Sequence, residues 1–133
     1  MINKQVKVLI IEDSWLESEL LKELLRSDLE RAGLGVSITA VENEKDAYIK
    51  LANNDYDIGV FDIDLDKRGA GLELLKQFSG KVAFPLISTA RQAEEVVSRG
   101  YKYGSEHFIN KPIDSTKISH VVNDYIRQSQ SRR

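Results

Sequence analysis

The 133-residue sequence contains no cysteine, which excludes a disulfide framework, thiolate metal sites and thiol catalysis. Long apolar runs are also missing, since the run Val8 to Ile11 ends at Glu12, far short of a signal peptide core or a membrane span. The net charge of −2 shows no basic excess of the kind that nucleic-acid binding needs. We therefore expect a soluble, cytoplasmic protein that contacts neither a membrane nor nucleic acid.

The length is typical of one domain, and no internal repeat or low-complexity linker divides the chain. We assign residues 1–127 to this domain and residues 128–133 to a polar, unstructured tail. Because little else follows the last expected helix, we expect any signal to leave the domain through contacts with other proteins.

Short apolar runs, rich in β-branched residues, alternate with helical patterns along the chain. Strands are predicted at residues 6–11, 36–41, 58–61, 82–87 and 107–109. The fourth strand has the weakest pattern because Pro85 lacks the N–H that a sheet uses.

Helices are predicted after each strand, and most begin at a capping residue. The first spans residues 14–32 and begins with a capping box of Ser14 and Glu17. The later helices begin at Asn43, near Gly71, at Thr89 with Gln92, and at Asp114. Strands and helices that alternate in this way predict an α/β fold with a parallel sheet covered on both faces.

Polar residues follow four of the five predicted strands. They are Glu12, Asp13, Asp62, Thr89 and Lys111. Since the carboxyl ends of parallel strands share one edge of the sheet, where α/β proteins bind ligands, we expect these side chains to form one site.

Several carboxylates at one site need a counter-charge. Two of them about 4 Å apart repel by roughly 4 kcal/mol at an effective dielectric constant near 20. Mg²⁺ prefers oxygen ligands and is commonly held by one or two carboxylates together with phosphate oxygens. A carboxylate can also attack phosphorus and form an aspartyl phosphate, and Asp62 is our candidate for this acceptor.

Four segments of the chain resemble the receiver domain of two-component response regulators. They are VLIIEDS, with the acidic pair; YDIGVFDIDL, with the acceptor; PLISTA, with a hydroxyl; and GSEHFINKP, with an aromatic residue and lysine. Their order and spacing carry the resemblance over nearly the whole chain. It implies a flavodoxin-like (βα)5 fold of the single-domain type, with strand order 2-1-3-4-5.

The resemblance also implies an acceptor and a metal site. Asp62 would receive a phosphoryl group from a histidine kinase or a histidine phosphotransfer protein. Mg²⁺, or Mn²⁺ in its place, would be bound by Asp13, by Asp62, by the backbone carbonyl of Asp64, and by Glu12 through water.

A phosphate-responsive set is implied as well. Lys111 would pair with a phosphate oxygen, Thr89 would hydrogen-bond to another, Ala90 would leave room for the phosphoryl group, and Phe108 would move as the aromatic switch. The response would reach a downstream protein through the surface of the fourth and fifth strands and helices. We expect a monomer or a weak homodimer.

Two departures from the family pattern favour an alternative, a non-cycling pseudo-receiver that only binds proteins: Asp66 stands where proline is frequent in a loop about one residue longer than usual, and the third helix is short. A third departure, the Asp64 side chain, adds an acid near the metal site. A small phosphatase is a third possibility, since an Asp-x-Asp pair occurs in such enzymes. An EF-hand reading fails because Lys67 occupies the position that needs glycine.

Overall fold

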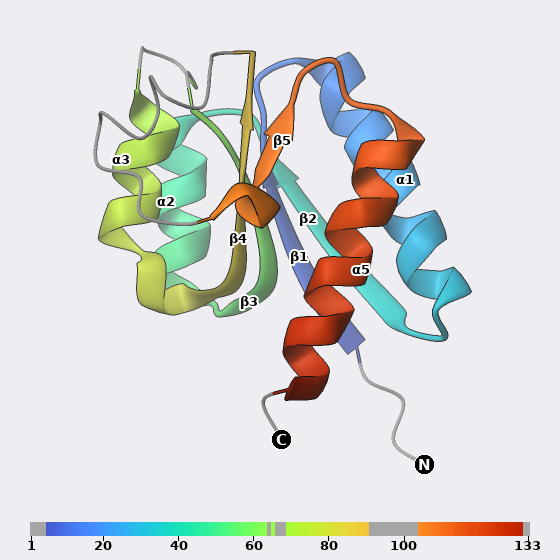
Figure 1. Ribbon diagram of the computed structural model, residues 1–133. Coiled ribbons are helices and arrows are strands. Elements are labelled where there is room, and N and C mark those ends of the chain that lie inside the picture. The colour runs from blue at the N-terminus through green and yellow to red at the C-terminus, as the bar shows by residue number, and fades with distance from the viewer. Residues whose placement is uncertain (1–4, 64, 66–68, 91–103, 132–133) are drawn as a thin grey trace.

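Five parallel strands form one sheet in the order β2-β1-β3-β4-β5 in the computed structural model (Figure 1). The structure describes residues 5–63, 65, 69–90 and 104–131. The strands are β1 Gln5–Ile11, β2 Gly35–Val41, β3 Tyr56–Asp62, β4 Val82–Thr89 and β5 Phe108–Asn110. This order confirms the predicted flavodoxin-like α/β fold.

Helices follow the strands as predicted. They are α1 Trp15–Arg31, α2 Glu44–Asn53, α3 Ala70–Gln77 and α5 Ser115–Ser131, with the short 3₁₀ helices η1 Ser79–Lys81 and η2 Ser105–His107. The helix expected after Thr89 falls in residues 91–103, outside the described part of the chain. The unstructured tail expected from residue 128 is wrong for residues 128–131, because α5 continues through them. No proline or glycine interrupts this stretch, and glutamine is a good helix former.

The sheet is covered on both faces, with α1 and α5 on one side and α2 and α3 on the other (Figure 1). Side chains of β1 alternate between the two cores. Val6, Val8 and Ile10 pack with α1 and α5, whereas Leu9 and Ile11 pack with α2 and α3. A strand buried on both faces explains why its sequence is an almost continuous apolar run.

Helix α1 carries two rows of leucines, of which one forms the core. Leu21, Leu25 and Leu29 are fully buried. Leu16 and Leu20, one position back along the helix, are 73% and 38% exposed. A shift of one residue turns a side chain by about 100° around a helix, so the second row lies beside the core rather than in it.

Pro85 is accommodated in the middle of β4. Its position pairs with Gly59 of β3 on one side, whereas β5 pairs with β4 only from Ile87 onwards. The Pro85 carbonyl lies 2.6 Å from Nδ1 of the buried His107, on the η2 side. The N–H and C=O of one strand residue point to the same side. An N–H at position 85 would therefore also point toward η2, where no strand pairs with this residue, and its absence in proline removes no hydrogen bond of the sheet.

Candidate functional site

The predicted site residues come together at the carboxyl edge of the sheet, the upper edge in Figure 1. Asp62 and Thr89 are the last residues of β3 and β4. Glu12 directly follows β1, and Lys111 directly follows β5. The strands β1, β3, β4 and β5 are consecutive neighbours in the sheet, so their ends supply one continuous row of functional groups.

Three carboxylates form an acidic cluster at this edge. Glu12, Asp13 and Asp62 each place a carboxylate oxygen within 4.8 Å of the other two. Glu12 and Asp62 are only 1% and 6% exposed, whereas Asp13 is exposed. Two of the charges are therefore removed from the water that would screen them, and a cation would relieve their repulsion.

Lys111 supplies one positive charge to the cluster. Its Nζ lies 2.8 Å from Oε1 of Glu17, 3.3 Å from Oε1 of Glu12 and 3.7 Å from Oδ2 of Asp62. The side chain is 20% exposed, so these ion pairs are only partly screened by solvent. One ammonium group thus faces more than one carboxylate, which leaves the site net negative.

Two backbone contacts hold the segment that carries Lys111. The N–H of Lys111 donates to the carbonyl of Thr89 at 2.8 Å. The ammonium of Lys117, in α5, donates to the carbonyls of Asn110 and Pro112 at 3.0 and 2.7 Å. Lys117 therefore bridges the residues on either side of Lys111 and fixes the turn from β5 into α5. The sequence does not indicate this role, since a lysine on a helix gives no signal of it.

The cluster shifts the protonation of its own members. Burial is the main reason that the pKa of Glu12 is raised from 4.5 to about 8, and the charge of Asp62 adds to this effect. Burial would by itself lower the pKa of the Lys111 ammonium, but the contact with Glu17 and the charges of the neighbouring carboxylates outweigh it and raise the pKa. The site thus favours protons and cations.

The N-terminus of α1 differs from the predicted capping box. The Ser14 hydroxyl accepts from the N–H of Glu17 at 3.3 Å, as expected. The prediction that the Glu17 side chain accepts from the Ser14 N–H is wrong, because this N–H donates to the Glu12 carboxylate at 3.0 Å instead. The Glu17 side chain instead pairs with Lys111. No local pattern in the sequence indicates this partner, because Lys111 comes from the segment after β5.

The remaining predicted site residues that the structure describes differ in how deeply they are buried. Thr89 is 1% exposed, and Ala90 beside it is exposed. Phe108 is half-buried against the core under α2 and α3. Asp64 lies outside the described residues, as does Asp66.

Gly71 packs directly on the backbone of the acceptor. A Cβ atom at this position would lie 1.8 Å from the Asp62 carbonyl oxygen and 3.0 Å from the Ile63 Cα. The Gly71 N–H donates to the Ile63 carbonyl at 3.2 Å. Only glycine permits this approach, which fixes the end of β3 against the first turn of α3.

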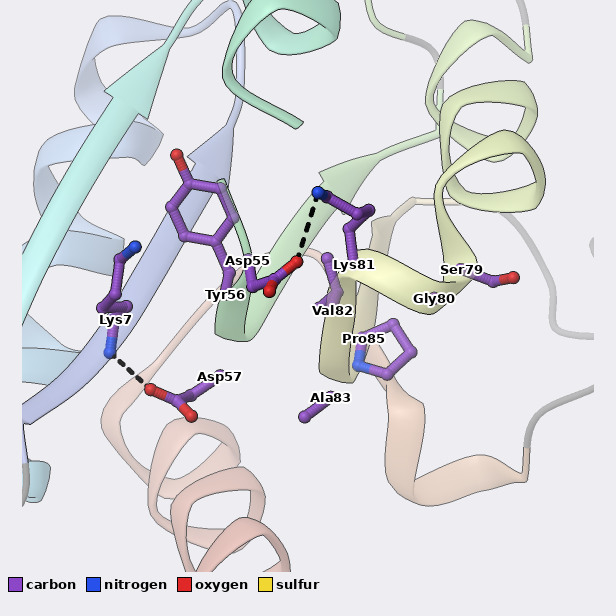
Figure 2. Close-up of a pocket in the computed structure, with 10 residues that line it drawn as sticks. All are labelled: Lys7, Asp55, Tyr56, Asp57, Ser79, Gly80, Lys81, Val82, Ala83 and Pro85. Carbon is purple, nitrogen blue, oxygen red and sulfur yellow. Dashed lines mark hydrogen bonds and ion pairs between the residues drawn. The ribbon is translucent and has the colours of Figure 1, made fainter. Parts of the chain in front are cut away.

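A pocket of about 690 Å³ lies at the other end of the strands (Figure 2). Its charged groups have partners within the pocket. The Lys7 N–H donates to Asp57 at 2.8 Å, the Lys7 ammonium lies 5.3 Å from the centre of the Tyr56 ring, and Lys81 pairs with Asp55 at 3.2 Å. This pocket contains none of the predicted site residues.

Comparison with known proteins identifies the family. Residues 8–123 match the model of the response regulator receiver domain. The chain belongs to the response regulator receiver domain family. It is therefore a signalling phosphoacceptor domain rather than an enzyme with a substrate of its own.

Curated relatives are longer than this receiver. It is 27% identical over 127 residues to the transcriptional regulatory protein CrdR of Helicobacter pylori, covering 90% of the chain and 56% of the relative. It is 22% identical to the transcriptional regulatory protein RprY of Bacteroides fragilis, covering 99% of the chain and 54% of the relative. The chain thus spans about half the length of these relatives.

Solved structures agree on the fold. A CheY-like receiver domain from Methylobacillus flagellatus superposes with a TM-score of 0.69 at 23% identity, covering 92% of this chain and 99% of that one. The receiver domain of an HD domain-containing protein from Pseudomonas fluorescens has a TM-score of 0.73 at 14% identity, covering 100% and 95%. Among the described helices, none has the length and apolar character that crossing a membrane requires.

Proposed function

We propose that this receiver accepts a phosphoryl group on Asp62 from the phosphohistidine of a histidine kinase or a histidine phosphotransfer protein. The observation that carries the proposal is the pairing of a buried acceptor carboxylate with an ammonium group. Asp62 is 6% exposed, and Oδ2 of its carboxylate lies 3.7 Å from Nζ of Lys111. Membership of the receiver family supports the same assignment.

The transfer is a nucleophilic displacement at phosphorus. A carboxylate oxygen of Asp62 forms the new P–O bond while the P–N bond to the donor imidazole breaks, and the imidazole nitrogen leaves with the bonding electron pair and takes up a proton. Negative charge on the transferring oxygens would be stabilised by Lys111, which already lies at the acceptor. Burial of Asp62 limits access of water to the product.

The acidic cluster fits a divalent cation of the Mg²⁺ class, with Mn²⁺ as an alternative. All its candidate ligands are oxygens, three carboxylates lie within 4.8 Å of one another, and the buried Oε1 of Glu12 has only the ion pair with Lys111 at 3.3 Å among the described residues. We assign Asp13 and Asp62 as direct ligands and Glu12 as a ligand through water, with the Asp64 carbonyl as a further donor. When bound, the ion would neutralise charge on the phosphoryl oxygens.

Phosphorylation would act as a local electrostatic switch. It replaces one negative charge on Asp62 by about two and adds acceptor oxygens. Thr89 and Lys111 would turn toward these oxygens, with Ala90 leaving room and Phe108 moving with Thr89. The changed surface of β4, β5 and α5 would bind a downstream protein, and the predicted share of the fourth helix in this surface lies outside the described residues. We place this receiver in the cytoplasm, as a monomer or weak homodimer that binds no nucleic acid itself.

Labelling with acetyl phosphate and Mg²⁺ tests the proposal. Intact-protein mass spectrometry should show one added phosphoryl group on the wild type and none on Asp62→Asn. The matched control is Asp55→Asn, which removes an 82%-exposed carboxylate at the other end of β3 and should be labelled like the wild type. Equal labelling of the Asp62→Asn protein would show that another residue is the acceptor.

A non-cycling pseudo-receiver is the second candidate, favoured by the eight residues of α3, in line with the predicted short third helix. Such a protein would bind partners without phosphate. Calorimetry that detects no Mg²⁺ binding, together with no labelling of the wild type, would support it over the phosphorylated receiver.

A further inference from the structure

The carboxylate closest to Lys111 is not the proposed acceptor. Nζ of Lys111 lies 2.8 Å from Glu17, compared with 3.7 Å from Asp62. Oε1 of Glu17 is buried, and within the described part of the chain Lys111 is its one ion-pair partner. The contact joins α1 to the segment after β5.

Local structure leaves the Glu17 side chain available for this contact. In a complete capping box the side chain at this helix position would bind the N–H of Ser14. That N–H is already used by Glu12. Glu17 still takes part in the cap through its own N–H, which donates to the Ser14 hydroxyl, and this bond fixes the point on α1 from which its side chain extends.

We propose that Glu17 is a positioning residue that holds Lys111 in the unphosphorylated state and competes with the arriving phosphoryl group for its ammonium. This inference rests on the proposed function and adds a determinant to it. A phosphoryl oxygen gains the Lys111 contact only if the ammonium shares or leaves Glu17. The contact therefore lowers the affinity of the site for a phosphoryl group.

Removal of the contact should strengthen anion binding rather than disorder the site. Without Glu17, Lys111 still faces Glu12 at 3.3 Å and Asp62 at 3.7 Å. Its backbone stays fixed by the bond to the Thr89 carbonyl. The ammonium would therefore remain beside the acceptor, with one competitor fewer. A residue that merely supported the fold would have the opposite effect, since its loss would weaken binding.

The test uses beryllofluoride, formed from beryllium chloride in excess fluoride with Mg²⁺, as the phosphoryl mimic. Calorimetry should show that Glu17→Gln binds it about fivefold more tightly than the wild type, at the upper end of what partly exposed ion pairs contribute. Glu17→Asp keeps the charge but shortens the reach by one methylene group. It should also bind more tightly, because the contact and not the net charge matters.

Glu19→Gln is the matched control, since it removes the same charge from α1 at a residue that pairs with Lys22. We expect its affinity to stay within about twofold of the wild type. Unchanged or weaker binding by Glu17→Gln would overturn the inference, as would wild-type affinity of Glu17→Asp, which would indicate simple charge repulsion. If the wild type binds no beryllofluoride, the proposed function itself fails.

Discussion

Replacing Gly71 by alanine tests how tightly α3 packs on the acceptor strand. The added Cβ would lie 1.8 Å from the Asp62 carbonyl oxygen and 2.6 Å from its carbonyl carbon, although separations below 3.0 Å are essentially never seen. The obstructing atoms belong to the backbone, so no side chain can rotate away. The end of β3 and the start of α3 must therefore separate by more than about 1 Å.

We expect this separation to destabilise the domain by about 3 kcal/mol, the upper end of the usual effect of overpacking. Urea unfolding followed by circular dichroism measures the change. With a slope of about 1.5 kcal/mol per molar urea, the midpoint should fall by about 2 M. Because the shift moves the acceptor backbone, labelling of Asp62 by acetyl phosphate should also slow.

Gly80→Ala is the control, because a Cβ at Gly80 meets no atom within 4 Å. It should leave stability unchanged or raise it by up to about 1 kcal/mol through the unfolded state. If Gly71→Ala unfolds within about 0.5 kcal/mol of Gly80→Ala, the close packing of α3 on the Asp62 backbone does not occur in solution.

Three further predictions concern the site. Without Mg²⁺, the contribution of Glu12 to the free energy of unfolding should be full below about pH 4.5 and be lost as the pH rises toward about 8, because the folded state keeps the proton of Glu12 to a higher pH than the unfolded state does. Urea unfolding at a series of pH values should show this loss of stability for the wild type and not for Glu12→Gln. The same pH dependence in both proteins would contradict the assignment. Lys117→Met should lower stability by about 1 kcal/mol in the same assay, since two carbonyls lose a charged donor, whereas no loss would show that the turn holds without it. Thr89→Ala should leave phosphoryl labelling of Asp62 intact but reduce the chemical shift changes that beryllofluoride causes; equal changes would refute its switch role.

The sheet and its functional edge could be predicted because strands buried on both faces have a continuous apolar pattern. Each run ends where the chain leaves the core, so Glu12 and Asp62 mark strand ends as well as functional groups. Pro85 weakened one prediction because a sequence does not show which side of a strand lacks a neighbour.

Side-chain partners were harder to predict than strand ends. Ser14 and Glu17 match a local capping pattern, yet the Ser14 N–H donates to its neighbour Glu12, and the Glu17 carboxylate pairs with the distant Lys111. The choice between local and distant partners depends on distances that a sequence does not contain. The sequence could not show that the row of leucines containing Leu16 lies outside the core, because both rows of α1 have helical spacing and the spacing does not show which row faces the sheet.

The bond from the Lys111 N–H to the Thr89 carbonyl extends the attachment of the short strand β5 to β4. β5 forms only three residue pairs with β4, whereas β1 forms seven with β2. Beyond these pairs, the N–H of Lys111, directly after β5, is bonded to the carbonyl of Thr89 at the end of β4. We therefore expect a displacement of the Thr89 backbone at the end of β4 to be transmitted through this bond to the backbone of Lys111.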